Sequence, residues 1–195
     1  GVWHIGEDGN NDVGGYRDST QFGNHGTGTS MTSASDVAGK VGQAQDFDGS
    51  SDRISIPQAD ILEPSSQINY SAWAKRDGVQ GDYAKVLWYG PNEPTPFGVY
   101  GLEANVSSDS DFGAKITSAT VLYHEYGITL NDAEWVYMGG NYDGSVFSSF
   151  RNGTEVSSSS YSVTIEDYGT EGLGIGDKYL TGQPFDGAVD EVRIS

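Results

Sequence analysis

Oxygen-bearing side chains recur at alternate positions in the first glycine-rich loop of the chain. Asp8, Asn10 and Asp12 are separated by single residues, and Gly14 follows closely. Carboxylate and amide oxygens are ligands that Ca²⁺ takes, and glycines permit the sharp turn that lets them converge on one ion. The pattern predicts either a calcium site or an ordinary solvated acidic loop.

A further carboxylate that could bind a metal lies in the last segment, residues 185–195. With a period of two, Ala188, Val192 and Ile194 share one face of a strand, and Asp190 falls on the same face. A carboxylate on a buried face must be paired, lie at the edge of that face or bind a cation. The segment therefore predicts a half-buried closing strand in which Asp190 has one of these roles.

Aromatic rings and an amide lie around a proline-rich loop in the middle of the chain. Trp88 and Tyr89 end a predicted strand, and Asn92 follows in a loop with three prolines. Aromatic rings stack on the axial hydrogens of a pyranose, and amides can fix its hydroxyl groups. These residues, with Tyr179 in the loop before the closing strand, are the predicted sugar contacts. The alternative is that the cluster forms an edge of the core.

Two other aromatic positions bear on a sugar site. Trp73 lies in a predicted strand at 69–76, and we expect its side chain in the core rather than against a sugar. His124, Glu125 and Tyr126 end another predicted strand, where a loop role and a glycan contact are both open.

The carboxylates do not follow the pattern of a glycoside hydrolase. That chemistry needs two carboxyl groups facing one cleft, which a strand provides at alternate positions. The Glu positions contain no E-x-D-x-E spacing, and Asp190 and Glu191 are adjacent. The chain has no Cys and no G-x-S-x-G motif, and its three His residues, at 4, 25 and 124, fit no zinc pattern. We therefore expect that the protein is not an enzyme.

The composition limits the fold and the partners. A chain of 195 residues with 28 Gly, 12 Tyr and 6 Pro is typical of many short strands joined by tight turns around one core. The net charge of −18 opposes binding to nucleic acid or anionic lipid, and no apolar run is long enough for insertion into a membrane. The length predicts a single domain, residues 1–195, which we expect to be monomeric. Because the last strand ends without a polar tail, we expect this domain to come from a longer multidomain protein.

Three segments carry a resemblance to a known family. Residues 39–49 are similar to a G-K-x-G-x-A-x-x-F-D-G run, residues 185–194 to an F-x-G-x-[IV]-D-E-V-R-I ending, and residues 135–153 to a central pair of strands with an asparagine-glycine hairpin. These motifs resemble the bacterial laminin-G-like modules of the concanavalin-A-like lectin and glucanase superfamily. The resemblance implies an all-β jelly-roll sandwich of two antiparallel sheets. It also implies a structural Ca²⁺, for which Asp190 matches the carboxylate ligand and Gly49 a carbonyl donor.

The residues and the resemblance together predict a non-catalytic, calcium-containing carbohydrate-binding module, similar to a lectin. We expect it in an exported bacterial protein such as a surface adhesin, outside the cell or at its surface, with a glycan or polysaccharide as partner. The alternative is a structural spacer or a protein-binding jelly roll without a sugar site, and a glycoside hydrolase is the third reading. The region at 91–130 matches the superfamily least.

Overall fold

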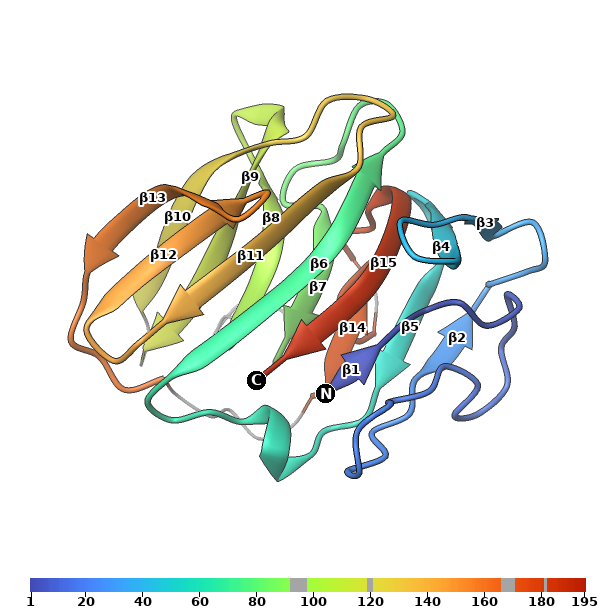
Figure 1. Ribbon diagram of the computed structural model, residues 1–195, viewed down its shortest axis with the longest axis horizontal. Coiled ribbons are helices and arrows are strands. Elements are labelled where there is room, and N and C mark those ends of the chain that lie inside the picture. The colour runs from blue at the N-terminus through green and yellow to red at the C-terminus, as the bar shows by residue number, and fades with distance from the viewer. Residues whose placement is uncertain (92–97, 119–120, 166–170, 181) are drawn as a thin grey trace.

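The computed structural model describes residues 1–91, 98–118, 121–165, 171–180 and 182–195. Two antiparallel sheets pack face to face, and the one helix in these ranges is a 3₁₀ turn, Asp60–Leu62. Figure 1 shows the sheets as two layers, with the two termini side by side. The described residues contain no helix with the length and apolar character needed to cross a membrane. The all-β sandwich predicted from the sequence is confirmed.

The first sheet has eight strands. Seven of them follow the order β13, β12, β11, β6, β15, β4 and β3, and β1 pairs with β15 beside this path. Their bounds are Thr154–Ser160 for β13, Val146–Arg151 for β12, Val136–Tyr142 for β11, Ile68–Arg76 for β6, Asp186–Ile194 for β15, Gln43–Asp48 for β4, Asp36–Ala38 for β3 and Val2–Trp3 for β1. Asn152 and Gly153, both with positive φ, form the predicted two-residue turn between β12 and β13.

The second sheet has seven strands, in the order β10, β9, β8, β7, β14, β5 and β2. Their bounds are Val121–Thr129 for β10, Ser108–Ser118 for β9, Tyr100–Asn105 for β8, Lys85–Tyr89 for β7, Leu173–Ile175 for β14, Arg53–Ile56 for β5 and Thr27–Thr29 for β2. This sheet contains most of the region that the sequence motifs matched least.

Aromatic side chains fill much of the space between the sheets. The ring of Tyr100 lies 5.3 Å from that of Tyr70, on the opposite sheet, and stacks on Tyr89 at 5.1 Å. The buried hydroxyl groups keep hydrogen-bond partners, since Tyr100 donates to the carbonyl of Leu62 at 3.0 Å and Tyr70 donates to the carbonyl of Lys115. A tyrosine can therefore fill the core here without an unpaired polar group.

A β-bulge at Glu191 changes the faces of the closing strand. Glu191 has a φ of 51°, and the pairing of β15 with β6 shifts register just after Asp190. The extra residue exchanges the two faces beyond the bulge. Ala188 and Asp190 consequently lie on the outer face, and the expectation that Ala188 shares a face with the later apolar residues is wrong. The residues of this strand in the core are Val189, Val192 and Ile194.

The expectation that Trp73 lies in the core is also wrong. Ala72 and Ala74, its neighbours along β6, belong to the core cluster, so the alternation of the strand directs Trp73 to the outer face. Its side chain is partly exposed there, with its ring 5.4 Å from that of Tyr137 on β11. The prediction of a strand here is confirmed, but the prediction of which face of it is buried is wrong.

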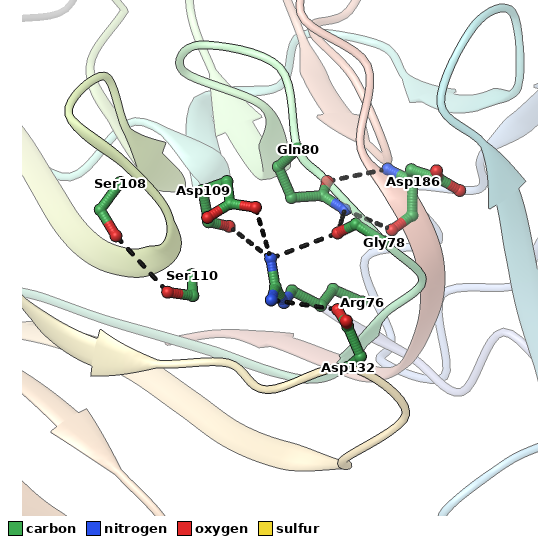
Figure 2. A network of polar contacts seen from close by, with 8 residues as sticks. All are labelled: Arg76, Gly78, Gln80, Ser108, Asp109, Ser110, Asp132 and Asp186. Atoms are coloured by element: carbon green, nitrogen blue, oxygen red, sulfur yellow. Dashed lines mark hydrogen bonds and ion pairs between the residues drawn. The ribbon is translucent and has the colours of Figure 1, made fainter.

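Arg76, at the end of β6, connects the two sheets. Its guanidinium group donates to the carbonyl and the carboxylate of Asp109 on β9, at 3.0 and 3.1 Å, and lies 3.0 Å from the carboxylate of Asp132 (Figure 2). Nearby, the side chain of Gln80 exchanges two hydrogen bonds with the backbone of Asp186, at 2.8 and 3.0 Å. The Gln80 contacts, with a hydrogen bond from Arg76 to the carbonyl of Gly78 at 3.2 Å, hold the loop at 77–84 that leads into β7.

Candidate functional site

The outer face of the seven-stranded sheet carries a pocket of about 420 Å³. Two neighbouring rows of paired residues cross β7, β8, β9 and β10 at this point. The first row consists of Trp88, Gly101, Lys115 and His124. The second row consists of Lys85, Glu103, Gly113 and Tyr126. Directly paired residues project from the same face of a sheet. Five members of the two rows line the pocket: Lys85, Trp88, Glu103, Lys115 and His124.

Two glycines make room for aromatic rings on this face. A Cβ atom at Gly101 would lie 2.8 Å from the ring of Trp88, and one at Gly113 would lie 2.5 Å from the ring of Tyr126. Both distances are far shorter than a van der Waals contact. The rings therefore occupy space directly above backbone that has no side chain.

Trp88 forms the base of the pocket and is 4% exposed. The ammonium groups of Lys85 and Lys115 lie 3.7 and 3.5 Å from the centre of its ring, within the range of cation–π attraction. The indole N–H of Trp88 is buried and has no hydrogen-bond acceptor in the described part of the chain. The indole packs against Gly98, where a Cβ atom would lie 2.4 Å from its Nε1.

Glu103 is the carboxylate of this pocket. It forms an ion pair with Lys85 and lies 3.0 Å from Nε2 of His124. Burial alone would raise the pKa of Glu103, but Lys85, together with His124 and Lys115, lowers that pKa to about 2. Glu103 is therefore ionised at physiological pH and accepts hydrogen bonds rather than donating a proton.

Partly exposed side chains complete the pocket wall. They are Tyr83, Leu122, His124 and Gln183. Tyr83 comes from the loop that the Arg76 and Gln80 contacts hold in place. An aromatic base surrounded by ammonium, carboxylate, imidazole and amide groups suits a ligand that has apolar ring faces and many hydroxyl groups.

The four predicted sugar contacts have different positions. Trp88 lines the pocket. Tyr89, the next residue of β7, points the other way into the core and is 1% exposed, so its ring is not available to a ligand. Tyr179 is partly exposed and lies outside the described residues that line the pocket. Asn92 lies outside the described residues.

Sequence reasoning missed Lys85, Glu103 and Lys115 as site residues. They come from three strands and meet only through the register of β7, β8 and β9. A signal was present, because a charged residue at Glu103 and at Lys115 alternates with apolar neighbours in the sequence. For His124, where two roles were open, the structure places the side chain at the pocket.

Asp190 is fully buried at the outer face of the eight-stranded sheet. Its Oδ2 accepts the backbone N–H groups of Lys40 and Val41, each at 2.8 Å, while Oδ1 has no partner among the described residues. Burial raises the pKa of Asp190 despite these hydrogen bonds. A buried carboxylate oxygen without a partner fits the role of a Ca²⁺ ligand.

The other predicted metal ligands do not join Asp190. Gly49 follows Asp48 of β4, which pairs with Asp186, the first residue of β15. Asp186 lies about 13 Å along the strand from Asp190. In the first loop, the amide of Asn10 donates to the carbonyl of Asp8 and accepts the backbone N–H of Asp12, so the loop closes on itself. The described residues contain no group of three His, Cys, Asp or Glu side chains placed to hold a metal.

Comparison with known proteins identifies the family. Residues 48–195 match a family model described as the concanavalin A-like lectin/glucanases superfamily. No curated protein matches the chain.

Solved structures show the same fold at low sequence identity. Domain 4 of AbnA, an extracellular GH43 arabinanase from Geobacillus stearothermophilus, in complex with arabinotriose, is 20% identical with a TM-score of 0.62, over 82% of this chain and 73% of that one. The binding domain of botulinum neurotoxin serotype G is 10% identical with a TM-score of 0.69, over 100% and 46%. Domains LG4-5 of the mouse laminin α1 chain are 13% identical with a TM-score of 0.56, over 78% and 40%.

The chain spans less than half of the toxin and laminin structures that it matches, and these identities show the fold alone. The family model, in contrast, covers well over half of the chain. The chain belongs to the concanavalin A-like lectin/glucanases superfamily.

Proposed function

We propose that this chain is a carbohydrate-binding module whose ligand enters the pocket above Trp88. The observation that carries the proposal is the pocket of about 420 Å³ at the ring of Trp88, with two ammonium groups beside that ring. The charged and amide groups around the ring would fix the hydroxyls of a sugar. The arabinotriose complex of a similar domain supports a saccharide as the ligand.

We propose binding without cleavage. Glycoside hydrolysis uses two carboxyl groups on either side of the scissile bond. Among the described residues that line the pocket, Glu103 is the one carboxylate, and its lowered pKa leaves it without a proton to donate. Its contacts with Lys85 and His124 support a structural role in holding those donors.

We also propose that the module binds a Ca²⁺ ion at Asp190 and belongs to an exported bacterial protein such as a surface adhesin. The unpartnered Oδ1 of Asp190 supports the ion, which when bound would neutralise the buried carboxylate. The similar domain from an arabinanase described as extracellular supports the location.

A glycan array tests the proposal. The chain should bind a defined set of glycans in calcium, and Tyr83→Asn should weaken that binding, because Tyr83 lines the pocket. Tyr179→Asn is the matched control, since Tyr179 is also partly exposed but lies away from that lining. A blank array from a chain with an intact β-sheet spectrum would contradict glycan binding and favour a spacer or protein-binding module.

A further inference from the structure

A second aromatic group lies on the opposite side of the molecule, on the outer face of the eight-stranded sheet. Trp73 of β6 and Tyr137 of β11 are direct cross-strand partners, and Trp135 immediately precedes β11. All three side chains are partly exposed. Aromatic rings left open on a sheet surface offer flat apolar faces to a ligand.

Two hollows adjoin the pair formed by Trp73 and Tyr137. The larger, of about 480 Å³, is lined by Lys40, Trp73, Trp135, Tyr137, Asn152 and Gly153. The smaller, of about 250 Å³, is lined by Val41, Trp73, Tyr137, Glu191 and Arg193. Because both hollows share the same two rings, an extended ligand could contact both.

The polar side chains around the larger hollow are mainly donors. Asn152 Oδ1 already accepts the backbone N–H of Tyr137 at 2.9 Å, which leaves the Nδ2 of Asn152 to donate. The indole of Trp135 can only donate. The exposed ammonium group of Lys40 lies 4.7 Å from the centre of the Trp73 ring and forms no ion pair with a carboxylate of the described residues.

The backbone at Lys40 is held in place by hydrogen bonds. Asp190 accepts the backbone N–H groups of Lys40 and Val41, and the backbone N–H of Gly39 donates to the carbonyl of Gly42 at 2.9 Å. The turn that carries Lys40 is therefore held against the sheet before any ligand arrives, which lowers the entropic cost of binding.

We propose that this outer face binds an acidic saccharide, with a pyranose ring on Trp73 and Tyr137 and its carboxylate against Lys40 and Asn152. Charge complementarity favours the acid: Lys40 is the charged side chain among the described residues that line the larger hollow, and a carboxylate would form a charged hydrogen bond with it that a neutral sugar cannot form. At physiological ionic strength charges more than about 8 Å away are largely screened, so the acidic surface elsewhere opposes binding only weakly. The site is on the other sheet from the pocket above Trp88 and goes beyond the proposed function.

Calorimetric titration with uronate tetrasaccharides and their neutral methyl esters tests the proposal. Tetrasaccharides of galacturonate, glucuronate and mannuronate serve as probes. The parent should bind at least one acid about tenfold more tightly than its ester, because a hydrogen bond to a charged group is lost in the ester. Lys40→Met should weaken binding of that acid about tenfold and leave the ester unchanged. Lys75→Met is the matched control, since its ammonium group lies 5.7 Å from the Trp135 ring but outside the lining of the hollow.

Trp135→Ala should weaken the acid and the ester alike, by about fivefold, because it removes an aromatic wall of the larger hollow that both ligands would contact. Tyr179→Asn, which lies outside the linings of both sites, should change neither.

Equal affinity of Lys40→Met and the parent for the acid would overturn the proposal, as would a parent that binds none of the three acids. Loss of binding in Tyr83→Asn but not in Lys40→Met would place the acid in the pocket above Trp88, which overturns this inference and leaves the proposed function intact. Self-association of the parent that Trp135→Ala abolishes, without any uronate binding, would assign the face to a second copy instead.

Discussion

The ammonium group of Lys115 lies 3.5 Å from the centre of the Trp88 ring, and only Gly101 separates the two residues in their row across the sheet. The contact needs three strands in register and a residue without a side chain between the partners. It brings a charge and an aromatic face together at the base of the pocket. The proposed binding site therefore depends on strand register more than on any single loop.

Gly101→Ala should damage the base of the pocket. The new methyl group would lie 2.8 Å from the ring of Trp88 and 2.7 Å from the carbonyl of Leu87, so the ring or the strand must move. We expect the free energy of unfolding to fall by about 1–3 kcal/mol, with weaker glycan binding. Gly81→Ala is the control, because a Cβ there meets nothing within 4 Å. Chemical denaturation and titration measure both effects, and equal values for the two variants would contradict the described packing.

Asp190 has two roles that two substitutions separate. Asp190→Ala removes the acceptor for the N–H groups of Lys40 and Val41 and should lower the melting temperature even in chelator. Asp190→Asn retains an acceptor oxygen for that turn but loses the carboxylate charge. Thermal melts with and without calcium should show stabilisation by calcium in the parent and little in either variant. The same calcium-induced shift in all three proteins would remove Asp190 from the proposed metal site.

Asp52 should make stability depend on pH. Burial, followed by the nearby charge of Asp48, raises the pKa of Asp52 to about 6, against about 3.9 in an unfolded chain. The folded state therefore binds more protons than the unfolded state between these values, and the free energy of unfolding falls as pH rises from about 4 to about 6. Above about pH 6 the full cost of keeping Asp52 ionised in the folded state lowers the free energy of unfolding.

Asp52→Asn removes this penalty. We expect it to raise the free energy of unfolding by about 2 kcal/mol at pH 7 and to change it little below pH 4. The comparison is made by urea denaturation in chelator, so that no bound cation stabilises the carboxylate. A variant that differs from the parent by the same amount at pH 4 and pH 7 would show that Asp52 does not titrate as described.

Arg76 should stabilise the end of the sandwich. Arg76→Met removes a largely buried guanidinium group that joins Asp109 on one sheet to β6 on the other, and we expect a loss of about 2 kcal/mol. Asp132→Asn is the control, because Asp132 is 64% exposed and an exposed ion pair contributes at most about 1 kcal/mol. If Asp132→Asn lowers the free energy of unfolding as much as Arg76→Met does, the contact between Arg76 and Asp109 does not account for the stabilisation.

Local patterns and a family resemblance together predicted the fold. Alternating apolar residues and the turn at Asn152 and Gly153 indicated individual strands, and the resemblance of three segments to the superfamily implied the antiparallel sandwich. The faces of the closing strand were not predictable in the same way, since a period of two contains no place for the extra residue at Glu191. Trp73 was misplaced for a related reason, because alternation defines two faces without saying which of them is buried.

The candidate site was only partly predictable. Trp88 could be found because an aromatic residue near a proline-rich loop is visible in one segment of sequence. Glu103 and Lys115 could not be joined to it, since their meeting depends on how three strands align. Tyr89 was predicted as a sugar contact because it is next to Trp88 in the sequence. Adjacent residues of a strand lie on opposite faces, so the ring of Tyr89 belongs to the core.

A crystal structure of the chain with a glycan selected from the array tests the central claim most directly. We predict a sugar in the pocket on the outer face of the seven-stranded sheet, with a hydroxyl group within hydrogen-bond distance of a lining side chain such as His124 or Gln183. A complex in which the glycan is bound elsewhere and the pocket above Trp88 holds no sugar would contradict it.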